Sequence, residues 1–480
     1  TLKVGATVVN FNPLYVEREI AYQIDDSETE IMVTMDLKGI YPKVAAMLPQ
    51  TQSLKTIVVC PMAQILPPIK GLLFRVLKKK DIAAVRESQA VAYHQLMNND
   101  GRPQAAEIDV DEDIAVLQYT GGTTGQPKGA MLTHGNLVAN MLQVYANMQQ
   151  IDRDGKKIAG EPGEVIIAPL PLYHIYAFTF HCMAMMVSGN HNILVTNPRD
   201  IPAFVKELSK FKFTGFVGLN TLFVALCNDE GFRALDFSKF KVTLSGGMAL
   251  QLATAERWKQ VTGCDICEGF GMTETSPVAT VNPISNIQLG TIGIPVPSTL
   301  CKVIDEDGNE LPLGERGELC VKGPQVMKGY WQRPEETAEA FFDEWFRTGD
   351  LGTEDADGYF HIVDRMKDMI IVNGMNVYPR VVEEILYQHE AVSEAAVIGD
   401  PSELHGEIPV AYIALTAEDA ATAADLRGFC REHLGNHEVP RKVFFLPELP
   451  KNAAGKIVKR ELRKVGELER GVDSRESPDA

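Results

Sequence analysis

The chain has 480 residues, of which 45% are hydrophobic and 23% are charged. These proportions are typical of globular proteins and exclude a mainly disordered, collagen-like or membrane-embedded chain. Asp and Glu number 64 against 46 Lys and Arg, which gives a formal net charge of −18. Such a surface repels polyanions, so we expect no nucleic-acid partner, and a small anionic ligand requires a local positive site.

At roughly 150 residues per domain, the length predicts about three units. The 8 cysteines are scattered along the chain, which indicates free thiols in a reducing compartment rather than a disulfide framework. No apolar run reaches the roughly 18 residues that a membrane-spanning helix requires; the nearest, residues 177–187, contains His181. The chain begins at Thr1 without a charged leader, so we expect it to start inside a folded unit.

Short β-branched runs alternate with helical patterns through the first half of the chain. This alternation predicts an α/β class in which helices cover mostly buried strands. We expect strands at 55–60, 164–169, 215–218 and 241–245 and helices at 136–148 and 202–211. From about Leu289, strand patterns at 301–304, 317–321 and 359–363 are broken by Gly and Pro, which predicts a barrel-like or antiparallel subdomain.

A small α+β domain is predicted after residue 363. Val381, Val382, Ile385 and Leu386 recur at helical spacing, and strands near 395–398 and 410–415 precede a helix near 425–434. We therefore place a large N-terminal domain at 1–363 and a small C-terminal domain at 364–480. The polar tail beyond Lys464 has little to bury and is expected to fray.

The strongest chemical signal is the segment YTGGTTGQPKG at 119–129, between a strand pattern at 114–118 and a helix pattern that starts near His134. Glycine N–H groups, hydroxyls and an ammonium group suit a chain of phosphates. The segment is not a Walker loop, because Pro127 precedes Lys128 and Gly129 follows it. On composition alone, a Gly/Thr-rich surface turn remains the alternative.

Two further glycine segments, LSGGMAL at 244–250 and EGFGMTETSP at 268–277, each follow a strand pattern. Glycine there lets the backbone approach a flat ligand or a phosphate. Phe270 can stack on a base, Thr273 can donate to a phosphate, and Glu274 can bind Mg²⁺. Taken singly, each residue is explained as well by a turn or a core aromatic, so their co-occurrence carries the argument.

Three later residues are further candidates, but their spacing in the sequence does not distinguish a functional role from a structural one. Asp350 in RTGDLG can accept from ribose hydroxyls, and Arg365 can bind a sugar or a phosphate, although both are explained equally by surface ion pairs. Lys456 lies in a glycine-containing loop before a basic helix pattern, in PKNAAGKIVKREL. Lys456 is either a charged side chain on a mobile loop, here called the charged finger, or an ordinary solvated lysine.

In this order and over nearly the whole chain, these segments resemble the adenylate-forming superfamily, which includes acyl-CoA synthetases, firefly luciferase and peptide-synthetase adenylation domains. Within it, PLYHIYAFTF, TNPRDIP, LNTLF, CVKGPQVMKGYWQRPEET and DRMKDMIIVNGMNVYPRVVEE are most similar to a bacterial long-chain fatty acid CoA ligase. The resemblance implies that a fatty acid carboxylate attacks the α-phosphate of ATP, and that the thiol of the co-substrate CoA then displaces AMP. Activation is needed because a carboxylate oxygen is a poor leaving group.

The resemblance also implies roles for individual residues. The loop around the β- and γ-phosphates comprises Thr120, Gly121, Gly122, Thr123, Thr124, Gly125 and Lys128. The adenine side is lined by Gly246, Gly247, Gly269 and Phe270, with Glu268 and Gly271 in the same cofactor-binding set. Thr273 belongs at the α-phosphate, Glu274 at Mg²⁺, and Asp350 and Arg365 at ribose. Lys456 bridges the acyl carboxylate and the α-phosphate during adenylation only.

The two half-reactions need different surroundings, and the family rotates its small domain between them. Here the implied hinge is 364–368 with Lys367 at the pivot, and Gly374, in a hairpin at 373–376, would then face the pantetheine arm. His174 belongs near the acyl site, and Phe178 stands where some long-chain enzymes have a gating Trp. The apolar segment 177–187 suits an alkyl chain, or it is simply a buried helix.

Several alternatives stay open at this point. The chain could be an acyl-AMP ligase that loads a carrier protein, or a catalytically idle nucleotide-binding protein. Cys264 and Cys267 form a CxxC without a second pair for zinc. The segment 72–80, LLFRVLKKK, suits an anionic membrane surface or, as the favoured reading, a solvated helix end. We expect a cytoplasmic protein with peripheral contact with the inner membrane and, from the family, homodimer contacts.

Overall fold

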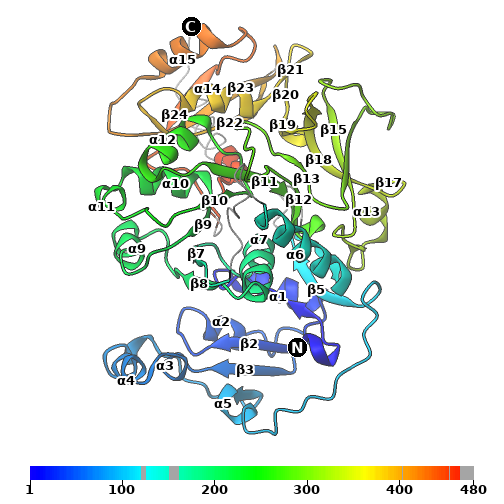
Figure 1. Cartoon of the computed structure of the whole chain (residues 1–480), viewed down its shortest axis with the longest axis vertical. Helices are drawn as coiled ribbons and strands as arrows, with labels where there is room; N and C mark the ends of the chain where they lie inside the picture. Colours follow the sequence, from blue (N-terminus) through cyan, green and yellow to red (C-terminus); the bar gives the residue numbers. More distant parts are fainter. Residues whose placement is uncertain (121–125, 151–161, 403, 453–454, 465–480) are drawn as a thin grey trace, which may run out of the picture. The chain divides into compact units, whose positions relative to one another are not determined.

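The structure, a computed structural model, describes residues 1–120, 126–150, 162–402, 404–452 and 455–464 (Figure 1). The described residues form two compact units. The first comprises residues up to His134 together with Lys328–Gln332, and the second comprises Gly135–Met327 and the described residues from Arg333 onward.

The first unit contains a three-stranded parallel sheet in the order β2-β3-β4 and a four-stranded sheet in the order β1-β5-β6-β16. Side chains of α1, α2, β2 and β3 share one apolar core that includes Ile24, Tyr41 and Ile57. The strands are β1 (Val8–Val9), β2 (Ile31–Met35), β3 (Thr56–Cys60), β4 (Ala90–Ala92), β5 (Ile114–Tyr119), β6 (Gly129–Thr133) and β16 (Gly329–Tyr330). The helices are η1 (Leu2–Val4), α1 (Glu17–Asp26), α2 (Tyr41–Ala45), α3 (Met62–Ile65), α4 (Pro68–Leu77), η2 (Lys79–Asp81) and α5 (Tyr93–Leu96).

The second unit is built on a seven-stranded sheet in the order β13-β12-β11-β10-β9-β7-β8. Strands β7 to β11 are parallel, whereas β12 and β13 run antiparallel. The strands are β7 (Val165–Ala168), β8 (His191–Leu194), β9 (Gly215–Gly218), β10 (Val242–Ser245), β11 (Ile266–Gly271), β12 (Val278–Val281) and β13 (Ile294–Pro295). The helices around this sheet are α6 (His134–Met148), α9 (Ile201–Leu208), α10 (Asn220–Asn228), α11 (Glu230–Arg233) and α12 (Leu252–Thr262).

Helices cover this sheet on both faces, because side chains of a strand alternate between its two sides. Phe216 of β9 packs in a core with Phe223 of α10 and Trp258 of α12. The next residue, Val217, packs in a second core with Met148 of α6. The buried parallel strands are therefore almost continuously apolar, as the α/β prediction requires.

Two five-stranded sheets complete the second unit. The first is antiparallel and contains β14 (Leu300–Ile304), β15 (Gly317–Lys322), β17 (Phe341–Phe342), β18 (Trp345–Glu354) and β19 (Phe360–Arg365), with α13 (Pro334–Glu339) beside it. The second contains β20 (Ile370–Val372), β21 (Met375–Val377), β22 (Val392–Ser402), β23 (Gly406–Leu415) and β24 (Lys442–Phe445). Its core residues include Val382 of α14 (Pro379–Tyr387) and Leu426 of α15 (Ala423–His433).

The α/β class and the expected strands and helices are confirmed, with ends that shift by a few residues. Two features were not expected. Strand β6 separates the glycine loop from the helix at His134, and part of the segment 177–187 is a π-helix. The boundary at 363/364 stays a prediction, and the expected fraying beyond Lys464 lies outside the described residues. No helix in the described parts of the chain is both long and apolar enough to cross a bilayer.

Candidate active site

The carboxyl ends of the parallel strands in the second unit gather most of the candidate residues. In open α/β sheets, ligands bind at this edge. His174 follows β7, Leu219 follows β9, Gly246 and Gly247 follow β10, and Gly269 lies on β11. Residues expected to line a nucleotide from separate parts of the sequence are thus brought to one edge by the sheet order.

The turn after β10 needs glycine at both positions. Gly247 has a φ of 82°, a left-handed conformation that other residues adopt with strain. A Cβ on Gly246 would lie 3.3 Å from the Tyr176 ring and 3.4 Å from the carbonyl oxygen of Gly269. The turn therefore packs closely against its neighbours and leaves backbone, not side chain, on the surface of the site.

Lys456 extends from the C-terminal part of the chain onto this turn. A Cβ built on Gly247 would lie 3.4 Å from Cε and 3.7 Å from Nζ of Lys456. The Lys456 loop is closed by Asn452, whose side-chain oxygen accepts from the Lys456 N–H at 3.0 Å. Arg199 donates to the Asn452 carbonyl at 3.2 Å. The predicted charged finger therefore reaches the glycine turn.

Positively charged side chains cluster around Asp350: burial raises the pKa of this carboxyl, and the rise is opposed by the charges of Arg365, Lys367, Lys456 and Arg380. Asp350 and Arg365 are paired across β18 and β19, with Oδ1 to Nε at 3.2 Å. Burial, and secondarily the positive charge of Arg365, lowers the pKa of Lys456 to about 8, while Asp350 and Glu274 oppose the shift. Burial and Arg365 also lower the pKa of Lys367. Because the chain as a whole is acidic, this cluster is the local positive site that an anionic ligand requires.

Asp350 holds an oxygen that is ready for a ligand. The residue is 3% exposed, and its Oδ2 is buried without a hydrogen-bond partner among the described residues. Burial raises the pKa of Asp350. A buried acceptor of this kind is normally satisfied, so hydroxyl groups of a sugar fit it.

His174 is neutral at physiological pH. Burial, and secondarily the charge of Lys456, lowers the pKa of His174 to about 4. Its Nδ1 accepts from the Tyr176 N–H at 3.4 Å and caps α7 (Ile175–Ala177). The proton of the neutral ring is therefore assigned to Nε2, which makes His174 an uncharged donor.

The segment at 268–277 makes a tight turn beside this edge. A Cβ on Gly271 would lie 1.9 Å from the Pro277 carbonyl oxygen, so only glycine fits. Thr273 and Glu274 lie in the short helix η4 (Thr273–Thr275), and the Glu274 carbonyl accepts from the Met327 N–H at 2.8 Å. The Glu274 carboxylate acts on the charges of both Lys367 and Lys456.

Two residues of the same segment, Glu268 and Phe270, contact other groups of the protein. The carboxylate of Glu268 is 5% exposed and accepts from the Leu250 N–H at 3.1 Å, so it supports the loop after β10. Burial raises the pKa of Glu268 to about 7. Phe270 is half-buried and packs against a core that includes Val303, Leu319 and Phe360, the environment of a core aromatic.

Thr120 and Lys128, near the two ends of the glycine and threonine segment, belong to the first unit. The segment joins β5 to β6, and the Thr120 N–H donates to the Lys128 carbonyl at 2.9 Å. The Lys128 ammonium lies 4.8 Å from the centre of the Tyr330 ring, a favourable cation–π distance. The five residues between them that were expected to contact phosphates lie outside the described residues: Gly121, Gly122, Thr123, Thr124 and Gly125.

The implied hinge and the hairpin after it are ordered. The Asp364 carboxylate accepts from the N–H groups of Arg365 and Arg380, so it joins the end of β19 to the start of α14. Burial raises the pKa of Asp364 to about 6. Lys367 lies in η5 (Met366–Asp368). Gly374, with a φ of 79°, forms the turn between β20 and β21.

The expected acyl segment is an interrupted helix. It comprises α7, the π-helix η3 (Phe178–Ala184) and α8 (Met185–Val187). π-Helical turns are rare and frequent at functional sites. Phe178 is half-buried, whereas Phe180 and Met185 pack in the core with Leu219 and Leu244. Thr179 donates to the Ser276 carbonyl at 2.8 Å, which ties this segment to the Thr273 turn.

Sequence reasoning missed three residues of this site. The Tyr176 ring packs on Gly246, Leu219 would meet a Cβ on Gly455 at 2.9 Å, and Asn452 closes the Lys456 loop. Tyr176 and Leu219 lay inside segments used for the resemblance but had no role assigned.

The CxxC is not a pair of exposed thiols, since Cys264 and Cys267 are both buried and their Sγ atoms lie 3.4 and 3.0 Å from backbone carbonyl oxygens. No group of three or more potential metal ligands occurs in the described part of the chain.

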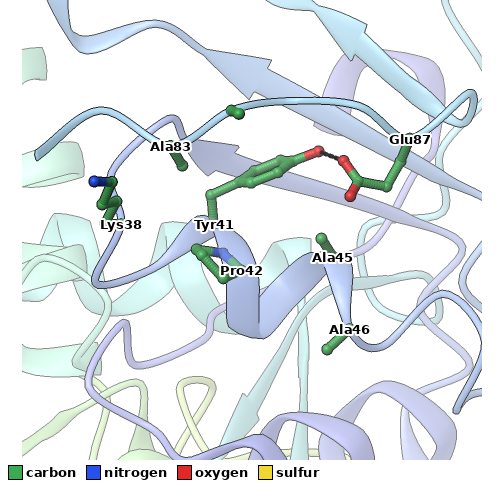
Figure 2. Close-up of a pocket in the computed structure, with 8 residues that line it drawn as sticks. Lys38, Tyr41, Pro42, Ala45, Ala46, Ala83 and Glu87 are labelled. Atoms are coloured by element: carbon green, nitrogen blue, oxygen red, sulfur yellow. Dashed lines mark hydrogen bonds between the residues drawn. The ribbon is translucent and has the colours of Figure 1, made fainter. Parts of the chain in front are cut away.

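A separate hollow of about 510 Å³ lies in the first unit (Figure 2). Alanine and proline side chains line most of it, and the Tyr41 hydroxyl hydrogen-bonds Glu87 at one side (Figure 2). None of the residues expected from the sequence to act on a substrate lines this hollow. It gives no support to a second reaction centre.

Comparisons with known proteins give matches over nearly the whole chain. A family model described as AMP-binding enzyme matches residues 1–331, and one described as AMP-binding enzyme C-terminal domain matches residues 381–456. A long-chain-fatty-acid–CoA ligase of Salmonella typhimurium is 44% identical over 468 residues, which cover 96% of this chain and 81% of that protein.

Solved structures show the same likeness. ATP-bound MatB from Rhodopseudomonas palustris has a TM-score of 0.81 and 29% identity, covering 97% of this chain and 84% of that one. The anthranilate CoA ligase AuaEII, in complex with anthranoyl-AMP, has a TM-score of 0.79 and 27% identity, covering 98% of this chain and 84% of that one.

Proposed function

Because the chain belongs to the AMP-binding enzyme family, we propose that it is an acid–thiol ligase that activates a long-chain fatty acid with ATP and transfers the acyl group to CoA. The products are acyl-CoA, AMP and pyrophosphate. The observation that carries this proposal is the position of Lys456 against Gly247, inside a cluster with Arg365 and Lys367. A long-chain fatty acid is proposed as the substrate because the related ligases are named for that class of acid.

The proposed chemistry depends mainly on charge. Attack of a carboxylate on the α-phosphate brings two anions together and drives off a third, so positioned cations stabilise the transition state more than the ground state. Lys456 bridges the carboxylate and the α-phosphate, while Thr273 donates to that phosphate. Neutral His174 donates from Nε2 without adding a charge at the acyl side.

The nucleotide is held by backbone and by buried oxygen. Gly246, Gly247, Gly269 and Phe270 line adenine, and the three glycines present backbone to it because they carry no side chains. Asp350 Oδ2, which has no partner among the described residues, accepts from ribose hydroxyls, and Arg365 orients Asp350. Glu268 supports the adenine turn through Leu250, and the loop from Thr120 to Lys128 surrounds the outer phosphates.

Glu274 is the proposed Mg²⁺ ligand. A single carboxylate fits this ion, which usually takes one or two protein carboxylates and completes its shell with waters and substrate phosphates. Bound Mg²⁺ supplies charge neutralisation for the phosphates. The negative charge of Glu274, like that of Asp350, acts to raise the pKa of the nearby Lys367 and Lys456.

The second half-reaction follows a rotation of the C-terminal domain, 364–480, relative to the N-terminal domain, 1–363. Lys367 is the pivot, and Gly374 then contacts the pantetheine arm. The Asp364 carboxylate accepts from the N–H groups of Arg365 and Arg380, and these contacts within the proposed small domain support a boundary before Asp364. We place the enzyme in the cytoplasm, as a homodimer in peripheral contact with the inner membrane.

A panel of saturated acids from C2 to C18 tests the function. We expect ATP-dependent release of AMP and formation of acyl-CoA, with the largest kcat/KM for long chains. AMP release without thioester would contradict CoA transfer and support a ligase that loads a carrier protein. No AMP with any acid would contradict the enzyme assignment and support an idle nucleotide-binding protein.

A further inference from the structure

Helix α4 (Pro68–Leu77) attaches to the first unit by one narrow face. Gly71 is buried, and a Cβ there would lie 2.1 Å from the carbonyl oxygen of Ala63 in α3. Phe74, three residues later, is half-buried. Figure 1 draws α3 and α4 side by side. The close approach at Gly71 fixes which side of α4 faces the protein and which side faces away.

The face that points away is apolar. Its residues recur at i, i+3, i+4, i+7 and i+8 and are exposed by 51 to 76%: Ile69, Leu72, Leu73, Val76 and Leu77. In a surface helix of a globular protein this stripe normally faces the core. In α4 the apolar stripe instead faces away from the protein. Ile65 in the neighbouring α3 is 57% exposed and adds to the apolar surface. Contiguous exposed apolar side chains of this kind mark an interaction surface.

Basic residues border the apolar stripe and follow it. At about 100° per residue, Lys70 and Arg75 fall on its two sides, and Lys78, Lys79 and Lys80 continue the chain beyond it, all of them exposed. No Asp or Glu occurs from Met62 to Lys80. In a chain with a net charge of −18, this concentration of positive charge points to an anionic partner.

We infer that α4 and the following lysines dock the protein onto an anionic phospholipid bilayer. The helix lies in the plane of the interface, with its apolar face among the acyl chains and its basic residues at the headgroups. A second copy of this chain is disfavoured as occupant, because a two-fold interface would bring the basic residues of both copies together with no Asp or Glu from Met62 to Lys80 to pair with them. This inference rests on the proposed function, since a long-chain acid partitions into the same bilayer.

Sedimentation with vesicles tests the inference on the full chain. We expect the protein to bind vesicles of phosphatidylglycerol and phosphatidylethanolamine at least 10-fold more tightly than vesicles of phosphatidylcholine. Leu72→Ser with Val76→Ser should weaken binding to the anionic vesicles at least 10-fold, because both side chains are exposed and leave the fold intact. A matched control, Leu313→Ser with Leu404→Ser, removes exposed leucines elsewhere and should bind like the wild type.

Charge is tested by Lys78→Gln, Lys79→Gln and Lys80→Gln together. At about 1 kcal/mol per residue, the triple variant should lose roughly 100-fold or more in affinity for anionic vesicles. Activity on octanoate without vesicles should match the wild type in every variant, which separates failure of docking from failure of the proposed enzyme. Equal vesicle binding by the wild type and the Leu72→Ser/Val76→Ser variant would overturn the inference. The inference would also be overturned if the wild type were a dimer that the Leu72→Ser/Val76→Ser variant alone dissociates.

Discussion

Lys456 and His174 differ in charge although they lie close together. Lys456 stays partly protonated because its lowered pKa, about 8, is still above neutrality, whereas the lowered pKa of His174, about 4, leaves the imidazole neutral. Burial is the main cause of both shifts. The same environment therefore yields one cation, which we propose acts on the phosphate, and one neutral donor, which we propose acts on the acyl group.

This difference predicts a pH profile for adenylation. A lysine whose pKa has fallen from 10.5 to about 8 loses its charge as the pH rises through 8, so kcat/KM for ATP in acyl-AMP formation should fall above about pH 8. The parameter kcat/KM reports groups of the free enzyme. Titration of His174 should cause no further change in kcat/KM between pH 6 and pH 9.

Thioester formation from supplied acyl-AMP is the control for that profile, because Lys456 is proposed to act in adenylation only. It should show no loss of rate between pH 8 and pH 9. An identical alkaline loss in both half-reactions would contradict the assignment.

At the level of elements, the turn after β10 connects the sheet edge to Lys456. Gly247→Ala should reduce the rate of acyl-AMP formation at least 10-fold, because its Cβ would contact Lys456 Cε at 3.4 Å and alanine is strained at the left-handed φ of this turn, so relief of that strain displaces Lys456. Gly314→Ala is the matched control: its φ of 83° resembles the 82° of Gly247, but nothing lies within 4 Å of the added Cβ.

Both substitutions should lower the free energy of unfolding by about 1–2 kcal/mol, the typical cost of a left-handed non-glycine residue. Only Gly247→Ala should slow adenylation. Similar rates for the two variants would show that the contact with Lys456 has no part in the reaction.

Element by element, regular patterns in the sequence predicted most of the fold. Strands such as β9 and β10 are short apolar runs between turns, and the helix at α6 has clear periodicity, so local pattern was sufficient. Strand β6 was missed because its residues, GAMLT, are too few to show a strand period between the loop and the helix. The π-helix was missed because its apolar residues fit an ordinary buried helix equally well.

The site was predictable as a set of residues but not as a geometry. Glycine segments and the resemblance identified Gly246, Gly247 and Lys456. The contact between them joins residues more than 200 positions apart, and no local pattern encodes it. The role of Glu268 in holding Leu250 and the core packing of Phe270 likewise depend on tertiary neighbours, which spacing along the sequence cannot reveal.

At the scale of the whole molecule, one compact unit contains both the strand edge and the loop that carries Lys456. The structure therefore presents the arrangement suited to adenylation, with the lysine at the glycine turn. In the proposed mechanism, the second half-reaction requires this loop to leave, because the thiol of CoA, on a long arm, enters where the lysine lies. The central claim is that Lys456 serves the first step alone.

Separate assays of the two half-reactions in Lys456→Ala test this claim most directly, with the exposed Lys464→Ala as control. We predict that Lys456→Ala loses roughly 100- to 1,000-fold in acyl-AMP formation, the usual effect of removing a group that stabilises developing charge. Its rate of acyl-CoA formation from supplied acyl-AMP should stay within a few-fold of the wild type, and Lys464→Ala should be normal in both. Equal loss of the two steps, or adenylation at the wild-type rate, would contradict the account.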